Sequence, residues 1–491
     1  MCESGRSRSP SASLKRCKGY FGQGQQRPER IMVEFSQPNT HKAFHVGHLR
    51  TTVLGDAVCN ILSFAGFQVI RANYIGDIGL HVIKWIWNYQ KFHSDEQPPS
   101  DMVRWLGELY VEANRHLEED PTAELEVREL FARWDRQEDD IVELWSQTRK
   151  WSLEAFEQVY RLLEIRFDQV FYESEMEDVG KAMVDDLIRR GIAKDQRPDG
   201  AVIIPLDEIF GTKEKYRTLV ILRSDGTSLY ATKEIPLAIM KFEKFKLDRS
   251  IYVVDVRQSL HLQQTFKTLE LMGYPWTSNC IHLAYELVNL PGNVTIASRE
   301  GAVVLLEDLV EEASGRALTI IKEKNPDLSE DQQKSIARMV ALGAIKFSML
   351  SRDTTSIVTF DWDAALDFNG QAAPYIQYAA VRASSIIKRS KLDRLPEIKI
   401  TGVLEKQEVA LIESLTNFPQ AVQRAADELK PLYITNAALD IAQRFNEFYN
   451  HCPVLQADID IRSFRLNLVA AARQVIQNSL TLLGIPTPNV M

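Results

Sequence analysis

The sequence has few cysteines, and no two of them are closely spaced. Five are scattered over its 491 residues, at Cys2, Cys17, Cys59, Cys280 and Cys452, with no CxxC pair. This distribution supports neither a disulfide framework nor a zinc cluster. We therefore predict a protein of a reducing, cytoplasmic setting with no metal site of its own.

Long apolar runs and an excess of basic residues are also missing. The longest apolar stretch, residues 339–350, contains Lys346 and predicts a buried helix, so we expect no membrane partner. The net charge of −9 argues against a general nucleic-acid coat. Residues 372–491, however, hold 13 Lys and Arg against 11 Asp and Glu, so that segment carries +2 and the rest −11. A near-neutral segment of this kind can approach a polyanion that the remainder repels.

The overall composition is that of a soluble globular protein, 45% hydrophobic and 25% charged. A chain of 491 residues is too long for a single core, which predicts two or three domains. The opening stretch ESGRSRSPSASLKR has almost no apolar residues and cannot form a core. We interpret residues 1–18 as a disordered tail, or as an upstream stretch read from an unusual start, rather than as a transit peptide, because an amphipathic face is missing.

From residue 30 onward the patterns predict an α/β fold with a parallel, doubly wound sheet. Residues 30–39 are an apolar strand ended by Pro38-Asn39, residues 47–65 have helical apolar spacing closed by Gly66, and QVIRANYIGD is a second strand. An insertion at about 90–217 interrupts the sheet, with charged helices over 103–171. We predict β-structure at 201–205 and at 218–232, around the turn Asp225-Gly226.

The sheet resumes with a buried strand at residues 249–256, a helix at 260–272 and the strand IHLAYELV. Beyond residue 305 we expect only helices, at 332–350, 375–388, 408–429, 434–449 and 464–483. The fold is thus an α/β domain followed by an all-α bundle.

Three of the nine histidines lie in the stretch SQPNTHKAFHVGHLR, and two of them flank a glycine as His45-Val46-Gly47-His48. A strand ends here, Pro38 and Asn39 form a turn, and a helix begins. Nucleotides bind at such a strand end beside a helix N-terminus, where imidazoles can donate hydrogen bonds to phosphate. Gly47 would let a flat ring or a phosphate approach the backbone. A metal site would need further ligands, and none lies nearby at ligand spacing. A packing role would bury two histidines at a polar turn. The four residues alone do not decide between a phosphate site, a metal site and a packing role.

Together these features resemble the signature of class I aminoacyl-tRNA synthetases. The stretches VEFSQPN, FHVGHLR and the GDIG of residues 76–79 are similar, in particular, to arginyl-tRNA synthetases. Further stretches agree in the family's order: SDGTSLYATKEIPLAI, IYVVDVRQSLHLQQ, SREGAVVLLEDLVEEA, FDWDAALDFNGQAAPYIQYAAVRASSII and RLNLVAAARQVIQNSLTLLGIPTPNVM. The resemblance covers roughly residues 19–491.

The resemblance implies an arginine–tRNA ligase that uses ATP and Mg²⁺, forms an arginyl adenylate and passes L-arginine to tRNA(Arg). Mg²⁺ would come with the nucleotide, and activation can require tRNA in this family. His45, Gly47 and His48 match the ATP site, and both histidines match the catalytic pair that stabilises phosphate charge. The positions around arginine are matched by Glu34, Asn39, His45, Tyr230, Glu234 and Gln258. On pattern alone, Tyr230 could equally be a strand aromatic and Glu234 a solvated acid.

The chain departs from the family pattern in three ways. In the second signature, residues 296–301, Arg299 is the only cation and Glu300 stands where lysine is common. We assign Arg299 to catalysis and to ATP binding, and Gly301 to ATP binding. Lys42 is our candidate for a second positive charge near the phosphates. Glu234 stands where aspartate is usual, which moves the carboxylate by about 1.5 Å. The family's N-terminal domain that reads the tRNA elbow has no counterpart, so it is absent or the chain is a fragment.

The C-terminal helices resemble the family's anticodon-binding bundle. Arg382, Lys388, Arg389 and Arg473 fit a phosphate-contacting face, and Tyr378, Phe448 and Tyr449 could stack on bases. We therefore expect a Rossmann-like class I synthetase catalytic domain at 19–305 (insertion about 90–217), a helical connector at 306–371 and an anticodon-binding domain at 372–491, working as a monomer.

Two other functions remain open at this stage. One is a ligase of the same fold that joins an amino acid to a small amine, although such an acceptor needs no long helical bundle. The other is a catalytically impaired paralogue or fragment that binds tRNA but forms no adenylate.

Overall fold

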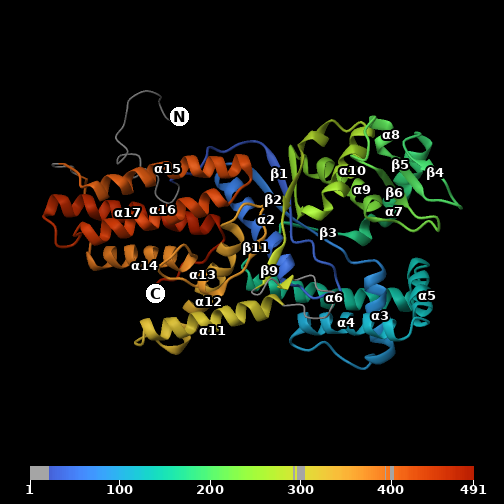
Figure 1. Cartoon of the computed structure of the whole chain (residues 1–491), viewed down its shortest axis with the longest axis horizontal. Coiled ribbons are helices and arrows are strands. Elements are labelled where there is room, and N and C mark those ends of the chain that lie inside the picture. The colour runs from blue at the N-terminus through green and yellow to red at the C-terminus, as the bar shows by residue number, and fades with distance from the viewer. Residues whose placement is uncertain (1–20, 291–293, 296–304, 393, 399–402) are drawn as a thin grey trace.

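The computed structural model describes residues 21–290, 294–295, 305–392, 394–398 and 403–491. It contains a parallel sheet with strand order β3-β2-β1-β7-β8. Figure 1 labels β1, β2 and β3 of this sheet near the middle of the molecule. Its strands are β1 (Arg30–Glu34), β2 (Gln68–Ile75), β3 (Gln169–Tyr172), β7 (Arg249–Asp255) and β8 (Cys280–Tyr285). The register sets Ile31 opposite Val69 on one side of β1 and opposite Arg249 on the other. The predicted α/β fold is confirmed.

The strand order reverses beside β1, which fixes where a ligand can bind. The chain leaves β1 toward β2 on one side and reaches β7 on the other. A crevice forms at such a switch point, outside the carboxyl ends of the strands. Glu34 is the last residue of β1 and Asp255 the last of β7, so both stand at this edge.

Helix α2 (Val46–Phe64) connects β1 to β2, as predicted. Most of its residues are buried, polar ones such as Arg50 and Asp56 included. The burial follows from its position, because α2 contacts the sheet on one side and the helices α12, α15 and α17 on the other (Figure 1). The helix that begins at the HxGH motif therefore also joins the two halves of the molecule.

Two groups of elements lie between β2 and β7. The first is helical: α3 (Leu80–Phe92), α4 (Met102–Glu119), α5 (Ala123–Asp135) and α6 (Asp139–Leu162). Its core contains many aromatic rings; Trp85 stacks on Tyr89 at 5.3 Å and meets Trp105 edge-on at 5.6 Å between ring centroids. The tryptophans of this charged region therefore serve packing.

The second group surrounds a small antiparallel sheet. It comprises η1 (Glu173–Met176), α7 (Glu177–Arg189), β4 (Lys194–Asp195), β5 (Val202–Pro205), α8 (Leu206–Phe210), β6 (Thr218–Leu222) and α9 (Tyr230–Phe245). The prediction of β-structure up to residue 232 is wrong from Tyr230, where α9 begins. The hydroxyl of Thr232 accepts the backbone N–H of Leu229 at 3.1 Å and so caps the helix. This local bond outweighs the strand preference of Tyr and Thr.

The chain then adds η2 (Val256–Gln258), α10 (Ser259–Leu271), η3 (Pro275–Asn279), β9 (Val288–Leu290) and β10 (Val294–Thr295). Helices follow: α11 (Leu306–Lys324), α12 (Glu330–Leu350), α13 (Trp362–Ala365), α14 (Ala373–Arg389), α15 (Lys406–Glu428), α16 (Leu432–His451) and α17 (Ile459–Leu482). The prediction of helix alone beyond residue 305 is wrong at β11 (Val358–Thr359), which pairs with β9. Two residues are too few for a periodic pattern to reveal.

Buried polar side chains connect the C-terminal helices to the α/β part of the chain. Lys346 of α12 is buried and donates hydrogen bonds to the carbonyls of Leu163 and Gly484, each at 2.6 Å. A buried ammonium requires such partners, so these bonds fix α12 against both neighbours. Among the helices that the structure describes, none is long and apolar enough to cross a membrane.

Candidate active site

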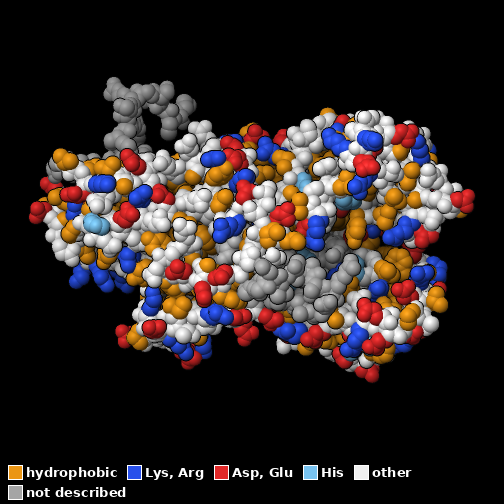
Figure 2. Space-filling view, in the orientation of Figure 1, with side chains coloured by type: hydrophobic (Ala, Val, Ile, Leu, Met, Phe, Trp, Pro, Cys, Tyr) orange, Lys and Arg blue, Asp and Glu red, His pale blue; other side chains and the backbone are white. Residues whose placement is uncertain are grey.

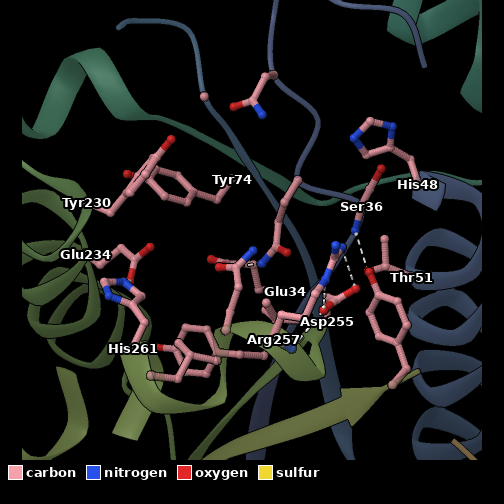
Figure 3. Close-up of a pocket in the computed structure, with 18 of the residues that line it drawn as sticks. Glu34, Ser36, His48, Thr51, Tyr74, Tyr230, Glu234, Asp255, Arg257 and His261 are labelled. Carbon is pink, nitrogen blue, oxygen red and sulfur yellow. Dashed lines mark hydrogen bonds and ion pairs between the residues drawn. The ribbon is translucent and has the colours of Figure 1, made fainter. Parts of the chain in front are cut away.

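A cavity of about 660 Å³ lies at the carboxyl edge of β1 and β7. Eight of the predicted site residues line it: Glu34, Asn39, His45, Gly47, His48, Tyr230, Glu234 and Gln258. Figure 3 shows His48 and Thr51 on one side, Tyr230, Glu234 and His261 on the other, and Glu34 between them. The predicted residues Arg299 and Gly301 lie outside the described part of the chain, as does Glu300.

The two histidines of the motif are oriented by the backbone that starts α2. The Nδ1 of His45 accepts the N–H of Gly47 at 3.0 Å, and the Nδ1 of His48 accepts the N–H of His45 at 3.3 Å. Since each Nδ1 is an acceptor, the hydrogen of each neutral ring resides on Nε2. The motif thus presents two Nε2–H donors at a helix N-terminus, whose dipole favours anions.

Both rings are neutral near pH 7. Burial, with the nearby charge of Lys42, lowers the pKa of His45 to about 4. Burial, followed by His45 and Lys42, holds the pKa of His48 well below its ordinary value. The ammonium of Lys42 lies 4.9 Å from the centre of the Tyr110 ring. The pair is therefore a set of neutral hydrogen-bond donors, and the positive charge nearby is that of Lys42.

Gly47 is needed for a reason internal to the motif. A Cβ at this position would lie 2.7 Å from Cε1 of the His45 ring. The ring of His45 therefore lies against this backbone, and Gly47 also lines the cavity. The approach of a ligand ring or a phosphate to Gly47 stays a prediction.

The loop between β1 and α2 is held in an unusual backbone conformation. Three of its non-glycine residues have positive φ: Ser36 (76°), Gln37 (49°) and His41 (61°). Their backbone N–H groups donate to Thr51 Oγ1 (3.3 Å), Asn73 Oδ1 (3.1 Å) and Ser152 Oγ (3.0 Å), respectively. Conformations of this kind persist where the surroundings fix them. The elements α2, β2 and α6 together fix the loop that carries Asn39.

Four carboxylates line the cavity, and each forms an ion pair. Glu34 pairs with Lys241 and also accepts Gln37 Nε2 at 2.9 Å. Glu234, in the first turns of α9, pairs with His261 at 2.7 Å. The two other pairs are Glu173 with Lys233 at 2.7 Å and Asp255 with Arg257 at 2.8 Å. Glu234 at one end and the phosphate donors at the other, with Glu34 between them, suit a ligand with a cationic side chain next to a nucleotide.

Sequence profiles match the chain over nearly its whole length. The profile described as "tRNA synthetases class I (R), catalytic domain" matches residues 12–362, and that of the DALR anticodon binding domain matches residues 376–491. The chain belongs to the arginyl-tRNA synthetase family. The predicted family is thereby confirmed, and with it the predicted arginine–tRNA ligase function rather than a small-amine ligase.

Individual arginyl-tRNA synthetases agree with this assignment. The arginine–tRNA ligase of Bdellovibrio bacteriovorus is 36% identical over 474 residues, which are 95% of this chain and 80% of that protein. That of Clostridioides difficile is 34% identical over 465 residues, with the same coverage of each. The solved arginyl-tRNA synthetase of Thermus thermophilus superposes with a TM-score of 0.80 at 29% identity, over 98% of this chain and 86% of that one.

The residues predicted to contact tRNA lie on the helical bundle of the synthetase. Lys388 and Arg389 are exposed at the end of α14. Arg382 is instead held within the bundle, 4.6 Å from the Tyr378 ring centre and 5.0 Å from that of Tyr449, with Nη1 donating to Asn446 at 2.5 Å.

Two further predictions for the bundle concern partly or wholly buried groups. Arg473 is partly buried, with its Nε hidden from solvent. Phe448 is fully buried, so the prediction that it stacks on a base is wrong; its helical spacing reflects the core.

Sequence reasoning missed five charged residues of this synthetase site: Glu173, Lys241, Asp255, Arg257 and His261. For two of them the sequence held a signal, namely helical spacing from a predicted site residue. Lys241 lies seven residues after Glu234, and His261 lies three residues after Gln258, so each falls on the same helix face as that residue. Glu173 is buried at the end of β3, an edge strand that no pattern predicted, so its approach to the cavity depends on the fold.

Proposed function

We propose that this chain attaches L-arginine to tRNA(Arg) with ATP, through an arginyl adenylate. In this proposal one group of cavity residues binds ATP and another binds arginine. The observation that carries the proposal is that His45, His48 and Glu234 line one cavity at the sheet switch point, with His48 and Glu234 on opposite sides of it (Figure 3). ATP would bind with its phosphates at the N-terminus of α2. Arginine would lie across β1, with its guanidinium toward Glu234 and its carboxylate toward the phosphates.

The first step is attack of the arginine carboxylate on the α-phosphorus, with pyrophosphate leaving. The Nε2–H groups of His45 and His48 then donate to phosphate oxygens as negative charge moves onto the leaving group. Lys42 adds positive charge from the same turn. No covalent bond to the protein forms, so positioning and hydrogen bonding provide the acceleration.

The amino-acid end of the cavity supports arginine. A guanidinium requires a carboxylate partner of planar geometry, and Glu234 offers one beside Tyr230 and Tyr74. The amides of Asn39 and Gln258 would hold the ammonium and carboxylate groups of the substrate. Glu34 makes one hydrogen bond through each oxygen and keeps acceptor capacity for the substrate.

Mg²⁺ would neutralise phosphate charge when bound. In the described part of the chain no cluster of three ligating side chains could hold an ion, and the cavity carboxylates are engaged in ion pairs. The residues present therefore do not form a metal site, and the ion would be carried by the triphosphate itself.

The helical bundle would position the tRNA. Lys388 and Arg389 are exposed cations suited to phosphate contacts, and Arg382 on α14 and Arg473 on α17 are further candidates. Cys59, Cys280 and Cys452 are free thiols, which suits a reducing compartment such as the cytoplasm.

Charging of total tRNA by the purified chain tests this proposal. Labelled arginine, lysine and citrulline are each supplied with ATP, Mg²⁺ and tRNA. We expect arginyl-tRNA alone. Retention of tRNA without any charging would instead identify the impaired paralogue, and charging of lysine at a similar rate would contradict the role of Glu234.

A further inference from the structure

When His261 is protonated, the charges of the four ion pairs at the cavity balance before any substrate enters. Each of the four carboxylates that line it contacts a cation of the same chain: Glu34 contacts Lys241, Glu173 contacts Lys233, Glu234 contacts His261 and Asp255 contacts Arg257. An arriving guanidinium therefore adds an unbalanced positive charge among these described residues. A cation in a buried site is costly without an anion of its own.

The four pairs differ in how far the cavity can reach them. The side chains of Glu34 and Lys241 are 4% and 1% exposed, and those of Glu173 and Lys233 are 5% and 7% exposed. Glu234 and His261 are 22% and 26% exposed, and Figure 3 shows them together on one wall. Asp255 is already held by both prongs of Arg257, at 2.8 and 3.0 Å. The accessible pair with a single contact is that of Glu234 and His261.

His261 also differs chemically from the other three cations. Lysine and arginine keep their charge near neutral pH, whereas imidazole can release its proton there. Burial acts to lower the pKa of His261, but the charge of Glu234 and its hydrogen bond outweigh burial and leave that pKa raised. The charge of His261 thus depends on its contact with Glu234.

Other titratable and charged groups share the cavity wall with the pair. They are Glu34 on β1, His45 and His48 at the start of α2, Tyr74 on β2, Glu173 on η1, Tyr230 and Lys241 on α9, Tyr252 and Asp255 on β7, Arg257 on η2 and Tyr285 on β8. Lys233 of α9 does not line the cavity but pairs with Glu173. Lys233 and Lys241 act on Glu234 and help keep it ionised. The group whose charge acts on His261 is Glu234.

We propose that His261 is a specificity-determining residue that releases its proton when arginine binds. The guanidinium binds the carboxylate of Glu234 in place of His261. The His261–Glu234 hydrogen bond breaks, and the imidazole remains as a neutral ring. The released proton passes to solvent, so the net charge of the cavity is the same before and after. This inference rests on the proposed placement of the guanidinium at Glu234.

This exchange favours the binding of a cationic substrate over that of a neutral one. A neutral isostere such as citrulline cannot replace the positive charge at Glu234, so His261 keeps its proton and its contact. Arginine, in contrast, binds more tightly as pH rises toward the pKa of His261 in the empty site, because less work is needed to remove the proton. The gain is up to about tenfold in affinity per pH unit, as expected for one proton, and it ends once the empty site is neutral.

Isothermal titration calorimetry of the full chain with L-arginine tests the proposal. Measured at one pH in two buffers of different ionisation enthalpy, the heats give the number of protons released. We expect up to one proton per arginine for the wild type and none for His261→Gln, which keeps an N–H donor for Glu234. No proton release by the wild type, or release that persists in His261→Gln, would overturn the proposal.

Glu234→Gln separates this inference from the proposed function. If that variant binds arginine as well as the wild type does, both the guanidinium site and the inference fail. If it loses arginine binding while the wild type releases no proton, the site stands and the inference alone fails. Should His261→Gln not fold, the pH dependence of wild-type arginine affinity decides: a rise with pH supports the proposal, and a flat profile contradicts it.

Discussion

The rings of His45 and His48 are stacked, with centroids 4.0 Å apart and planes inclined by 25°. Each ring accepts a backbone N–H through Nδ1, so each leaves Nε2–H for a ligand. The spacing of two histidines around one glycine follows from this geometry: His45 caps the helix, Gly47 makes room for its ring, and His48 returns one turn later to cap His45. One short motif both starts α2 and orients two phosphate donors.

Stability should depend on pH through His45. Its pKa is about 4 in the folded protein and 6.5 in the unfolded chain, so between these values the unfolded chain binds more protons. The free energy of unfolding is therefore highest above pH 6.5 and falls as pH drops toward 4, by on the order of 3 kcal/mol from this residue. Urea unfolding at pH 7 and pH 5 should show a smaller decline for His45→Gln than for the wild type. Equal declines would mean that His45 titrates normally.

Replacing Lys241 should destabilise the protein strongly. Its ammonium is buried, contacts Glu34 and lies 5.1 Å from the centre of the Tyr252 ring. Lys241→Met leaves the Glu34 carboxylate without its cation, at a cost of about 3–5 kcal/mol in the free energy of unfolding. Lys267→Met, which removes an ion pair with a half-exposed Glu270, is the matched control and should cost below about 1 kcal/mol.

A double-mutant cycle with Glu34→Gln completes that measurement. The double variant should be more stable than Lys241→Met alone, since no unpaired charge remains. Additive losses would show that the two side chains act independently.

Arg50 should be essential for folding although it touches no carboxylate. Its guanidinium donates to five backbone carbonyls, those of Glu286, Leu287, Asp353, Thr354 and Ser356. Burial lowers the pKa of Arg50 to about 10, which still leaves it charged at pH 7. Arg50→Lys cannot reach all five acceptors and should lower the free energy of unfolding by about 3 kcal/mol or more.

Lys430→Ala serves as the control for Arg50, because it removes one partly exposed ion pair to Asp353 in the same region. Its cost should be below about 1 kcal/mol. If thermal or urea unfolding shows equal losses for Arg50→Lys and Lys430→Ala, the buried network does not hold α2 to these loops.

The long periodic elements of the fold could be predicted from sequence. The boundaries of α2 and β2 follow from apolar spacing and the closing glycine, and the five C-terminal helices are where their periodicity placed them. The edge strand β3 and the two-residue β11 could not be predicted, because strands that short carry no pattern of their own. Tyr230 was misplaced because its strand propensity gave way to a helix cap formed by Thr232.

The site was predictable only in part. The HxGH motif and Glu234 were found because adjacent residues carry a recognisable pattern. The partners Lys241 and His261 were not, because pairing depends on which helix faces come together in the fold. The ion pairs matter for substrate binding, because each cavity carboxylate already has a partner in the empty site. No spacing in the sequence reveals this pairing.

The central claim, that one cavity holds phosphate donors at one end and the arginine partner at the other, is tested most directly by the charging kinetics of two variants. We predict that His48→Ala lowers kcat by about 10²–10³-fold and changes the KM for arginine little. Glu234→Gln should raise the KM for arginine by at least about tenfold and leave the KM for ATP unchanged, because a charged hydrogen bond to the substrate is lost. Equal effects of both variants on both substrates, or wild-type charging by either one, would contradict this division of the cavity.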